Sequence, residues 1–462
     1  MPKQKMLTLL ALVCVMLSTG LNWSPTQAQT KLPKLKIQTA ELPNGLKVVL
    51  HEDHRLPLVA IQVWYHVGSK DERPGRTGFA HLFEHLMFKG TKNLPSESID
   101  RLTEDVGGMN NAFTNDDVTV YLEIVPSHHL KRLLWAEADR MGALAVTEEN
   151  FRSERDVVKE ERRQSVENAP YGMVDEILYA SVFTKHPYQH TTIGSMEDLN
   201  RATLADVNEF HQSFYAPNNA TLVLSGDFDS AAILPVIKEY FSPISASSQP
   251  ITRITVVEPP QTAERRLTYK DPNAPLPQVR IAFHTPGNGH SDSYALRLLG
   301  AILSNGQSSR LYQSLVYQQG LATEANGSGY FSEHPNLFSF VATLAPEKTL
   351  PEGEKSLLAE IEKLQTSGVT ESELQKAKNQ LLASKLNGWQ SLMERAEALG
   401  QAATFFGDPN RALTDMEQLQ AVSIADVQAV AKKYFTPQNR TVIYVSLPEA
   451  ADTTKGTAGG AK

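Results

Sequence analysis

The sequence predicts an α+β protein made of two homologous domains, each with a mixed or antiparallel β-sheet packed with helices. Three observations support this fold class. The chain has 462 residues, more than one hydrophobic core usually covers. One stretch of sequence recurs at a fixed distance along the chain. Each half begins with strand patterns that are followed by longer helical patterns.

The composition is that of a soluble globular protein. Hydrophobic residues make up 41% of the chain and charged residues 21%, which excludes a mostly disordered chain. A mean hydropathy of -0.30 and a single long apolar run exclude a polytopic membrane protein. The formal net charge is -8, so nothing indicates a nucleic-acid partner, which would require a basic surface.

The first residues have the three-part pattern of a secretory signal peptide. Lys3 and Lys5 precede an apolar run at 7–17, and 26–28 is a small-x-small site. We therefore expect a signal peptide over 1–28 and an exported, periplasmic or otherwise extracytoplasmic protein. The alternative is an uncleaved anchor, although the apolar run is short for a membrane span. Cys14, the only cysteine, lies in this leader, which excludes thiol catalysis in the mature chain and suits a bacterial periplasm.

The repeat lies at the end of each half. Residues 205–224 read ADVNEFHQSFYAPNNATLVL, and residues 425–444, at an offset of 220, read ADVQAVAKKYFTPQNRTVIY. Identical Ala, Asp, Val, Pro, Asn and Thr positions, with aromatic and aliphatic types kept, favour duplication over a chance likeness of two helix–turn–strand units.

Between the halves, residues 242–261 are rich in proline and serine and are typical of a linker. The predicted domains are therefore 35–241 and 262–448, and the Thr/Gly/Ala-rich tail at 450–462 is expected to be disordered. Alternation of apolar and polar residues predicts strands, and helical periodicity predicts helices. The strands are expected at 46–50, 59–65 and 279–283, and the helices at 293–303 and 371–386.

The segment 78–88 contains His81-x-x-Glu84-His85 without a helix breaker after Gly78. On a helix the two histidines lie one turn apart on one face, with Glu84 beside them. Two imidazoles placed in this way can hold Zn²⁺, and the carboxylate can reach a water on the metal; the motif inverts the commoner His-Glu-x-x-His order. Taken alone, the alternative is a partly buried helix with solvated His and Glu side chains.

A catalytic zinc needs a third protein ligand, which must come from another element. The acidic helix predicted at 150–168 places Glu154, Val158 and Glu161 on one stripe. Glu160 lies about 100° away from that stripe, and periodicity alone does not choose between Glu160 and Glu161. Without the histidine motif, this segment would be taken for a solvated charged helix.

Together, these two motifs resemble the pitrilysin/insulinase family of zinc metallopeptidases, in the short two-domain bacterial type similar to mitochondrial processing peptidase subunits. The resemblance implies a fold that forms half of a clamshell. It also implies one Zn²⁺ per chain held by His81, His85 and Glu161, with Glu154 as a supporting acid. Residues 107–121 resemble the family's substrate-pairing strand and nominate Asn111 and Ala112 as substrate-binding residues.

The second half lacks the histidine motif, but its segment 308–317 resembles the family's Arg-x6-Tyr pair. Arg310 and Tyr317 would then bind substrate and assist at the scissile carbonyl. On an α-helix these two residues would lie two turns apart on one stripe. Without the resemblance, a surface arginine and a packed tyrosine would be the simpler interpretation.

These inferences predict an exported zinc endopeptidase that cleaves peptides or unfolded polypeptide segments, with Glu84 as the general base. Because one chain carries both the metal motif and the Arg/Tyr pair, a homodimer is expected, or else a heterodimer with a homologous chain. The alternatives are a catalytically silent or hetero-oligomeric partner subunit, and a non-peptidase hydrolase with the same metal chemistry.

Overall fold

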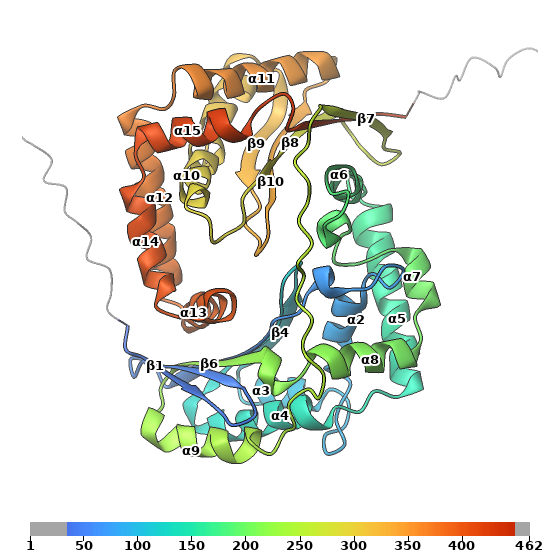
Figure 1. Ribbon diagram of the computed structural model, residues 1–462, viewed down its shortest axis with the longest axis vertical. Coiled ribbons are helices and arrows are strands. Elements are labelled where there is room, and N and C mark those ends of the chain that lie inside the picture. Colours follow the sequence, from blue (N-terminus) through green and yellow to red (C-terminus); the bar gives the residue numbers. More distant parts are fainter. Residues whose placement is uncertain (1–34, 449–462) are drawn as a thin grey trace, which may run out of the picture. The chain divides into compact units, whose positions relative to one another are not determined.

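The computed structural model describes residues 35–448 (Figure 1). It has two β-sheets, each packed with helices, and this confirms the α+β class with two related halves. The predicted signal peptide 1–28 and tail 450–462 lie outside the described residues. Within those residues, no helix has the length and apolar character needed to cross a membrane.

The first sheet has the strand order β1-β2-β6-β3-β5-β4. Only β2 and β6 run parallel, and the other neighbours are antiparallel. The strand β4 therefore forms one edge of the sheet. The bounds are β1 Ile37–Glu41, β2 Lys47–Glu52, β3 Leu58–Tyr65, β4 Met109–Thr114, β5 Thr119–Pro126 and β6 Ala220–Gly226.

The second sheet repeats this topology without a counterpart of β1. Its order is β7-β11-β8-β10-β9, with only β7 and β11 parallel, so β9 is the edge strand that corresponds to β4. The bounds are β7 Arg265–Lys270, β8 Gln278–Thr285, β9 Ala322–Gly329, β10 Asn336–Leu344 and β11 Arg440–Ser446.

The offset of 220 found in the sequence holds for whole elements. It relates α8 (Leu204–Phe214) to α15 (Ile424–Tyr434), β6 to β11, and β3 to β8. Both helices begin with a capping box, Thr203 with Asp206 in α8 and Ser423 with Asp426 in α15. Such a cap satisfies backbone N–H groups that a helix start leaves without partners, so the repeated residues specify the same local structure twice.

The remaining helices cover the sheets. In the first half they are α2 Phe79–Leu86, α3 Ser98–Glu104, α4 Leu130–Ala143, α5 Glu148–Arg162, α6 Val174–Val182, α7 Met196–Arg201 and α9 Ser230–Phe241. In the second half they are α10 Asp292–Ser304, α11 Leu350–Thr366, α12 Glu371–Gly388, α13 Leu392–Phe406 and α14 Arg411–Ala421. The predicted strands at 46–50, 59–65 and 279–283 and the predicted helices at 293–303 and 371–386 are confirmed to within two residues.

Each half lends a helix to the other half's sheet. The helix α6 packs on β11, and its residues share a buried cluster with Ile443 and Val445. The helix α13 packs on β3 and β6, where a Cβ on Gly400 would come within 2.2 Å of Trp64 Nε1. Only glycine therefore allows this close approach. The segment 242–264, which has no helix or strand, joins α9 to β7 (Figure 1).

Candidate metal centre

The helix α2 is held at its N-terminus by a buried carboxylate. Gly78, at φ +89°, begins the helix in the left-handed conformation that glycine tolerates. The Gly78 and Ala80 N–H groups donate to the Glu72 carboxylate at 2.9 and 2.8 Å. Glu72 thus satisfies donors that the first turn leaves without partners, while its burial raises the pKa of this carboxyl well above the usual value. Glu72 was not among the predicted site residues.

The histidines lie one turn apart on α2, as the motif predicts. Their ring centroids are 4.9 Å apart. The neighbouring side chains of Leu82, Phe83 and Leu86 are buried in the core of the first half and fix the rotation of the helix. His81 and His85 are only partly buried, so both rings border the site and are not part of the hydrophobic core.

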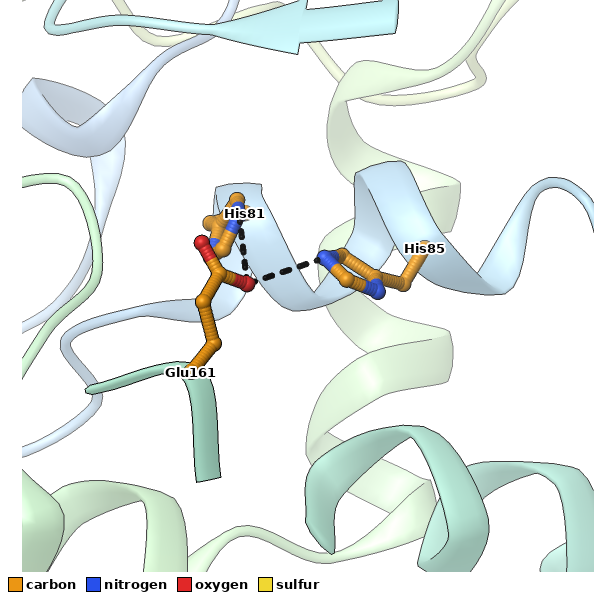
Figure 2. A group of neighbouring side chains, drawn as sticks. All are labelled: His81, His85 and Glu161. Carbon is orange, nitrogen blue, oxygen red and sulfur yellow. Dashed lines mark ion pairs between the residues drawn. The ribbon is translucent and has the colours of Figure 1, made fainter. Parts of the chain in front are cut away.

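The helix α5 brings the third side chain. Glu161 Oε2 lies 3.7 Å from His81 Nε2 and 3.6 Å from His85 Nε2 (Figure 2). One ligand atom from each of these three residues lies within 4.8 Å of the other two. Glu160, the alternative that periodicity left open, instead accepts hydrogen bonds from Arg163 and Gln164, and among the described residues it forms no ion pair with either histidine.

Glu154 lies on the same face of α5 and contacts the other side of the His85 ring. Its Oε2 is 3.5 Å from His85 Nδ1, while Oε1 is 3.1 Å from Lys89 Nζ. Burial disfavours the charged His85, but the Glu154 and Glu161 carboxylates outweigh burial and raise its pKa to about 9. A carboxylate at Nδ1 orients the ring so that Nε2 faces Glu161, as expected of a side chain that supports a metal ligand.

This donor set fits zinc. Zinc takes imidazole nitrogen and carboxylate oxygen at about 2.0–2.2 Å, and tetrahedral geometry puts neighbouring ligand atoms roughly 3.4 Å apart. The nitrogen–oxygen separations of 3.6 and 3.7 Å are close to that spacing. Burial lowers the pKa of His81 to about 4, so its ring is neutral near pH 7, whereas His85, with a pKa of about 9, must release its proton when a metal binds.

Glu84 follows His81 by three residues and is held by the edge strand β4. Thr114, the last residue of β4, donates a hydrogen bond to Glu84 Oε2 at 2.6 Å. Burial raises the pKa of Glu84, while the bond from Thr114 and the charge of His85 partly offset that rise. Thr114 was not among the predicted site residues, although it lies in the segment that resembled a substrate-pairing strand.

The predicted substrate residues lie on that same edge strand. Asn111 is exposed and Ala112 half-buried, and they pair with Leu122 and Tyr121 of β5. The Ala112 N–H is taken by the Asn111 side chain, whose Oδ1 accepts it at 2.9 Å. Among residues 35–448 no strand pairs with the outer side of β4.

The Arg/Tyr pair is not part of this cluster. Arg310 donates to Glu373 and to the Gly368 carbonyl, and Tyr317 has 75% of its side chain exposed. Within the described chain, neither forms a hydrogen bond or ion pair with the two histidines, Glu84 or Glu161.

The expected α-helical stripe at 310–317 was wrong. Residues Tyr312–Gln318 form a π-helix, which bonds i to i+5 and turns less per residue than an α-helix. A spacing of seven therefore does not return the side chain to the same face. This geometry agrees with the different surroundings of Arg310 and Tyr317.

Comparison with known proteins gives a consistent set of relatives. Residues 47–195 match the family described as "Insulinase (Peptidase family M16)", and residues 201–381 match "Peptidase M16 inactive domain". The chain is 32% identical over 426 residues to the "Zinc protease PqqE" of Helicobacter pylori, covering 90% of this chain and 94% of that protein.

Two further comparisons extend the likeness. A probable mitochondrial-processing peptidase subunit beta of Arabidopsis thaliana is 25% identical, over 87% of this chain and 76% of that protein. The crystal structure of a protease from Helicobacter pylori superposes with a TM-score of 0.86 at 30% identity, covering 89% of this chain and all of that one.

Proposed function

Since this chain belongs to the insulinase family of peptidases (peptidase family M16), we propose that it is an exported zinc endopeptidase that cleaves peptides or unfolded polypeptide segments. The convergence of His81, His85 and Glu161 beside Glu84 carries this proposal. The test is peptide cleavage measured together with zinc content, on the wild-type chain and on variants of Glu84 and Glu161.

The two histidines and Glu161 would hold the zinc ion, and Glu154 would orient His85. Zinc bound there supplies Lewis-acid chemistry, since it lowers the pKa of water to about 7 and polarises a carbonyl. Glu84 accepts the proton of the attacking water and later gives it to the leaving amine. Its partly buried position and its bond to Thr114 support this role, because both hold the carboxylate in one place.

The substrate would add to the sheet as an extended strand along β4, at Asn111 and Ala112. Backbone pairing supplies affinity without reading many side chains, and this favours peptides and unfolded segments over folded proteins. The exposed edge position of β4 and the contact between Thr114 and Glu84 support this placement, because they bring the strand next to the general base.

Replacing Thr114 by valine tests this link between strand and base. Valine has nearly the same shape as threonine but cannot donate the hydrogen bond to Glu84. We therefore expect the Thr114→Val variant to have a kcat roughly tenfold lower and a KM little changed. Steady-state kinetics on a peptide substrate measure both constants. Thr39→Val, at an exposed position of β1, is the matched control. A rise in KM at constant kcat would instead show that Thr114 serves substrate binding only.

Arg310 and Tyr317 would serve the metal centre of a second copy of the chain, in a homodimer. The exposure of Tyr317 supports this, since the described residues leave 75% of it accessible. In the alternative form of this proposal, the second chain is a homologous protein and the assembly is a heterodimer.

Co-expression of two inactive chains tests the sharing of the site. Glu84→Gln and Tyr317→Phe chains are each expected to be inactive alone. If the site is shared, half of the mixed dimers' sites are intact, so random pairing restores about a quarter of wild-type activity. Differently tagged chains allow the mixed dimer to be purified and assayed. A purified mixed dimer without activity would contradict sharing.

The alternative function is a catalytically silent subunit that keeps the fold, as the family name of the C-terminal match suggests. The complete set of His81, His85, Glu161 and Glu84 speaks against it. We also propose cleavage of the leader after Ala28 and a periplasmic location. Mass spectrometry of the purified protein's N-terminus and cell fractionation test both.

A further inference from the structure

The second half contains a hollow of about 600 Å³ bordered by α10, β9, α12, α13 and α14. This volume falls in the range of small-molecule binding sites. The hollow lies where the first half has its metal centre, because α10 and β9 correspond in topology to α2 and β4. The duplicated architecture thus leaves a second place for a ligand.

The hollow cannot bind zinc in the way proposed for the first half. Ala301, Ser304 and Asn305 line the hollow at the C-terminal end of α10, and among the described residues no histidine lines it. The Ser304 hydroxyl accepts from the Gly327 N–H at 2.6 Å and donates to its carbonyl at 2.8 Å, so both backbone groups of Gly327 are already paired. A ligand must therefore be held by other groups.

Among the described residues, two donors at the hollow lack a partner and a third is only partly paired. The Arg297 guanidinium lies 4.0 Å from the centroid of the Phe331 ring, and only its Nη2 has a partner, the Asn288 side chain at 2.7 Å. Lys385 has no carboxylate within ion-pair distance among the described residues. The Trp389 indole N–H is buried without a hydrogen-bond partner, in a residue only 6% exposed.

Lys385 is reachable from solvent yet recessed. The residue is exposed to water, but protein atoms surround its side chain closely enough that burial, with the nearby charge of Arg297, lowers its pKa. The carboxylates of Glu397, Asp415 and Glu394 partly offset this lowering, but among the described residues none forms an ion pair with Lys385. An anion at this position would give Lys385 a closer partner and relieve its repulsion with Arg297.

The rest of the hollow defines the size and charge of that anion. Apolar side chains of α12 and α14, and Phe406 of α13, offer an apolar wall. Glu394 and Glu397 of α13 and Asp415 of α14 also border the hollow and would repel a polyphosphate or a nucleotide. A singly charged group attached to an apolar body matches both features.

We propose that this hollow binds an organic carboxylate with an apolar body, held at its charged end by Lys385, Arg297 and Trp389. The C-terminal residues of a hydrophobic peptide and a medium-chain fatty acid share this chemistry. The proposal does not depend on zinc or on peptidase activity, since none of its residues belongs to the metal centre.

Calorimetric titration of the full chain, in buffer containing a chelator, tests the proposal with three probes. These are N-acetyl-leucyl-phenylalanine, the same dipeptide as its C-terminal amide, and decanoate. We expect the dipeptide acid to bind at least about tenfold more tightly than the amide. If decanoate binds and competes with the dipeptide, the site accepts any carboxylate with an apolar body. If the dipeptide acid binds and decanoate does not, the ligand is the C-terminus of a peptide.

Variants locate the binding to the hollow. Lys385→Met should weaken binding of the acid about tenfold, and Ala398→Leu, which fills the hollow from α13, should weaken it for every probe that binds. Lys432→Met, at an exposed position of α15, is the matched control and should bind as the wild type does. The proposal would be overturned if the acid and the amide bound equally well, or if Lys385→Met bound the acid as tightly as the wild type does. It would also be overturned if no probe bound at about 5 mM.

Discussion

Glu84→Gln should retain zinc and lose peptidase activity by roughly a thousandfold. The amide has nearly the shape of the carboxylate and can still accept the hydrogen bond from Thr114, so the fold and the nearby metal ligands should persist. It cannot take up the proton of the attacking water, which removes the general base. Peptide cleavage and metal analysis on the same preparation measure the two effects.

The matched control is Glu149→Gln, an exposed glutamate in the first turn of α5. It should keep both zinc and activity. If Glu84→Gln cleaves peptide as fast as the wild type, Glu84 is not the base. If it loses zinc as well, the carboxylate serves the metal's binding and the division of roles proposed above is wrong.

Glu161→Gln should instead lose the metal. A neutral amide oxygen is a much weaker zinc ligand than a carboxylate, so we expect zinc affinity to fall roughly a hundredfold or more, and activity with it. Because Glu161 is part-exposed, with 43% of its side chain accessible, the folded structure should tolerate the change. Competition with a chelator of known affinity measures the zinc dissociation constant.

The neighbouring glutamate provides a sharp control. Glu160→Gln makes the same carboxylate-to-amide change at the preceding residue of the same helix, but Glu160 accepts hydrogen bonds from Arg163 and Gln164. It should bind zinc and cleave peptide as the wild type does. Equal losses in the two variants would show that general charge on α5 matters, and the assignment of Glu161 as a ligand would fail.

The fold was predictable because the signals for it are local and occur twice. A capping residue and the apolar residues that follow it specify α8 and α15 at the same offset, whatever surrounds them. The histidine motif was predictable for the same reason, since a helix of any length puts i and i+4 on one face. These features depend on neighbours a few residues apart.

Other features escaped because no periodic or capping pattern marks them in the sequence. The Thr114 contact to Glu84 joins segments 30 residues apart, and the Glu72 contact reaches back to α2 across a loop that has no regular period. The exchange of α6 and α13 between the halves was likewise not visible. The π-helix at 312–318 replaced the expected α-helical spacing of Arg310 and Tyr317.

The choice between Glu160 and Glu161 separates what the sequence determines from what depends on the tertiary structure. Periodicity fixes the angle between the two side chains, because rotation per residue is a property of one helix. It does not fix which of them faces another helix, because that depends on how α5 is rotated against α2. Burial of Val158 and Glu154 sets this rotation and turns Glu161, not Glu160, towards the two histidines.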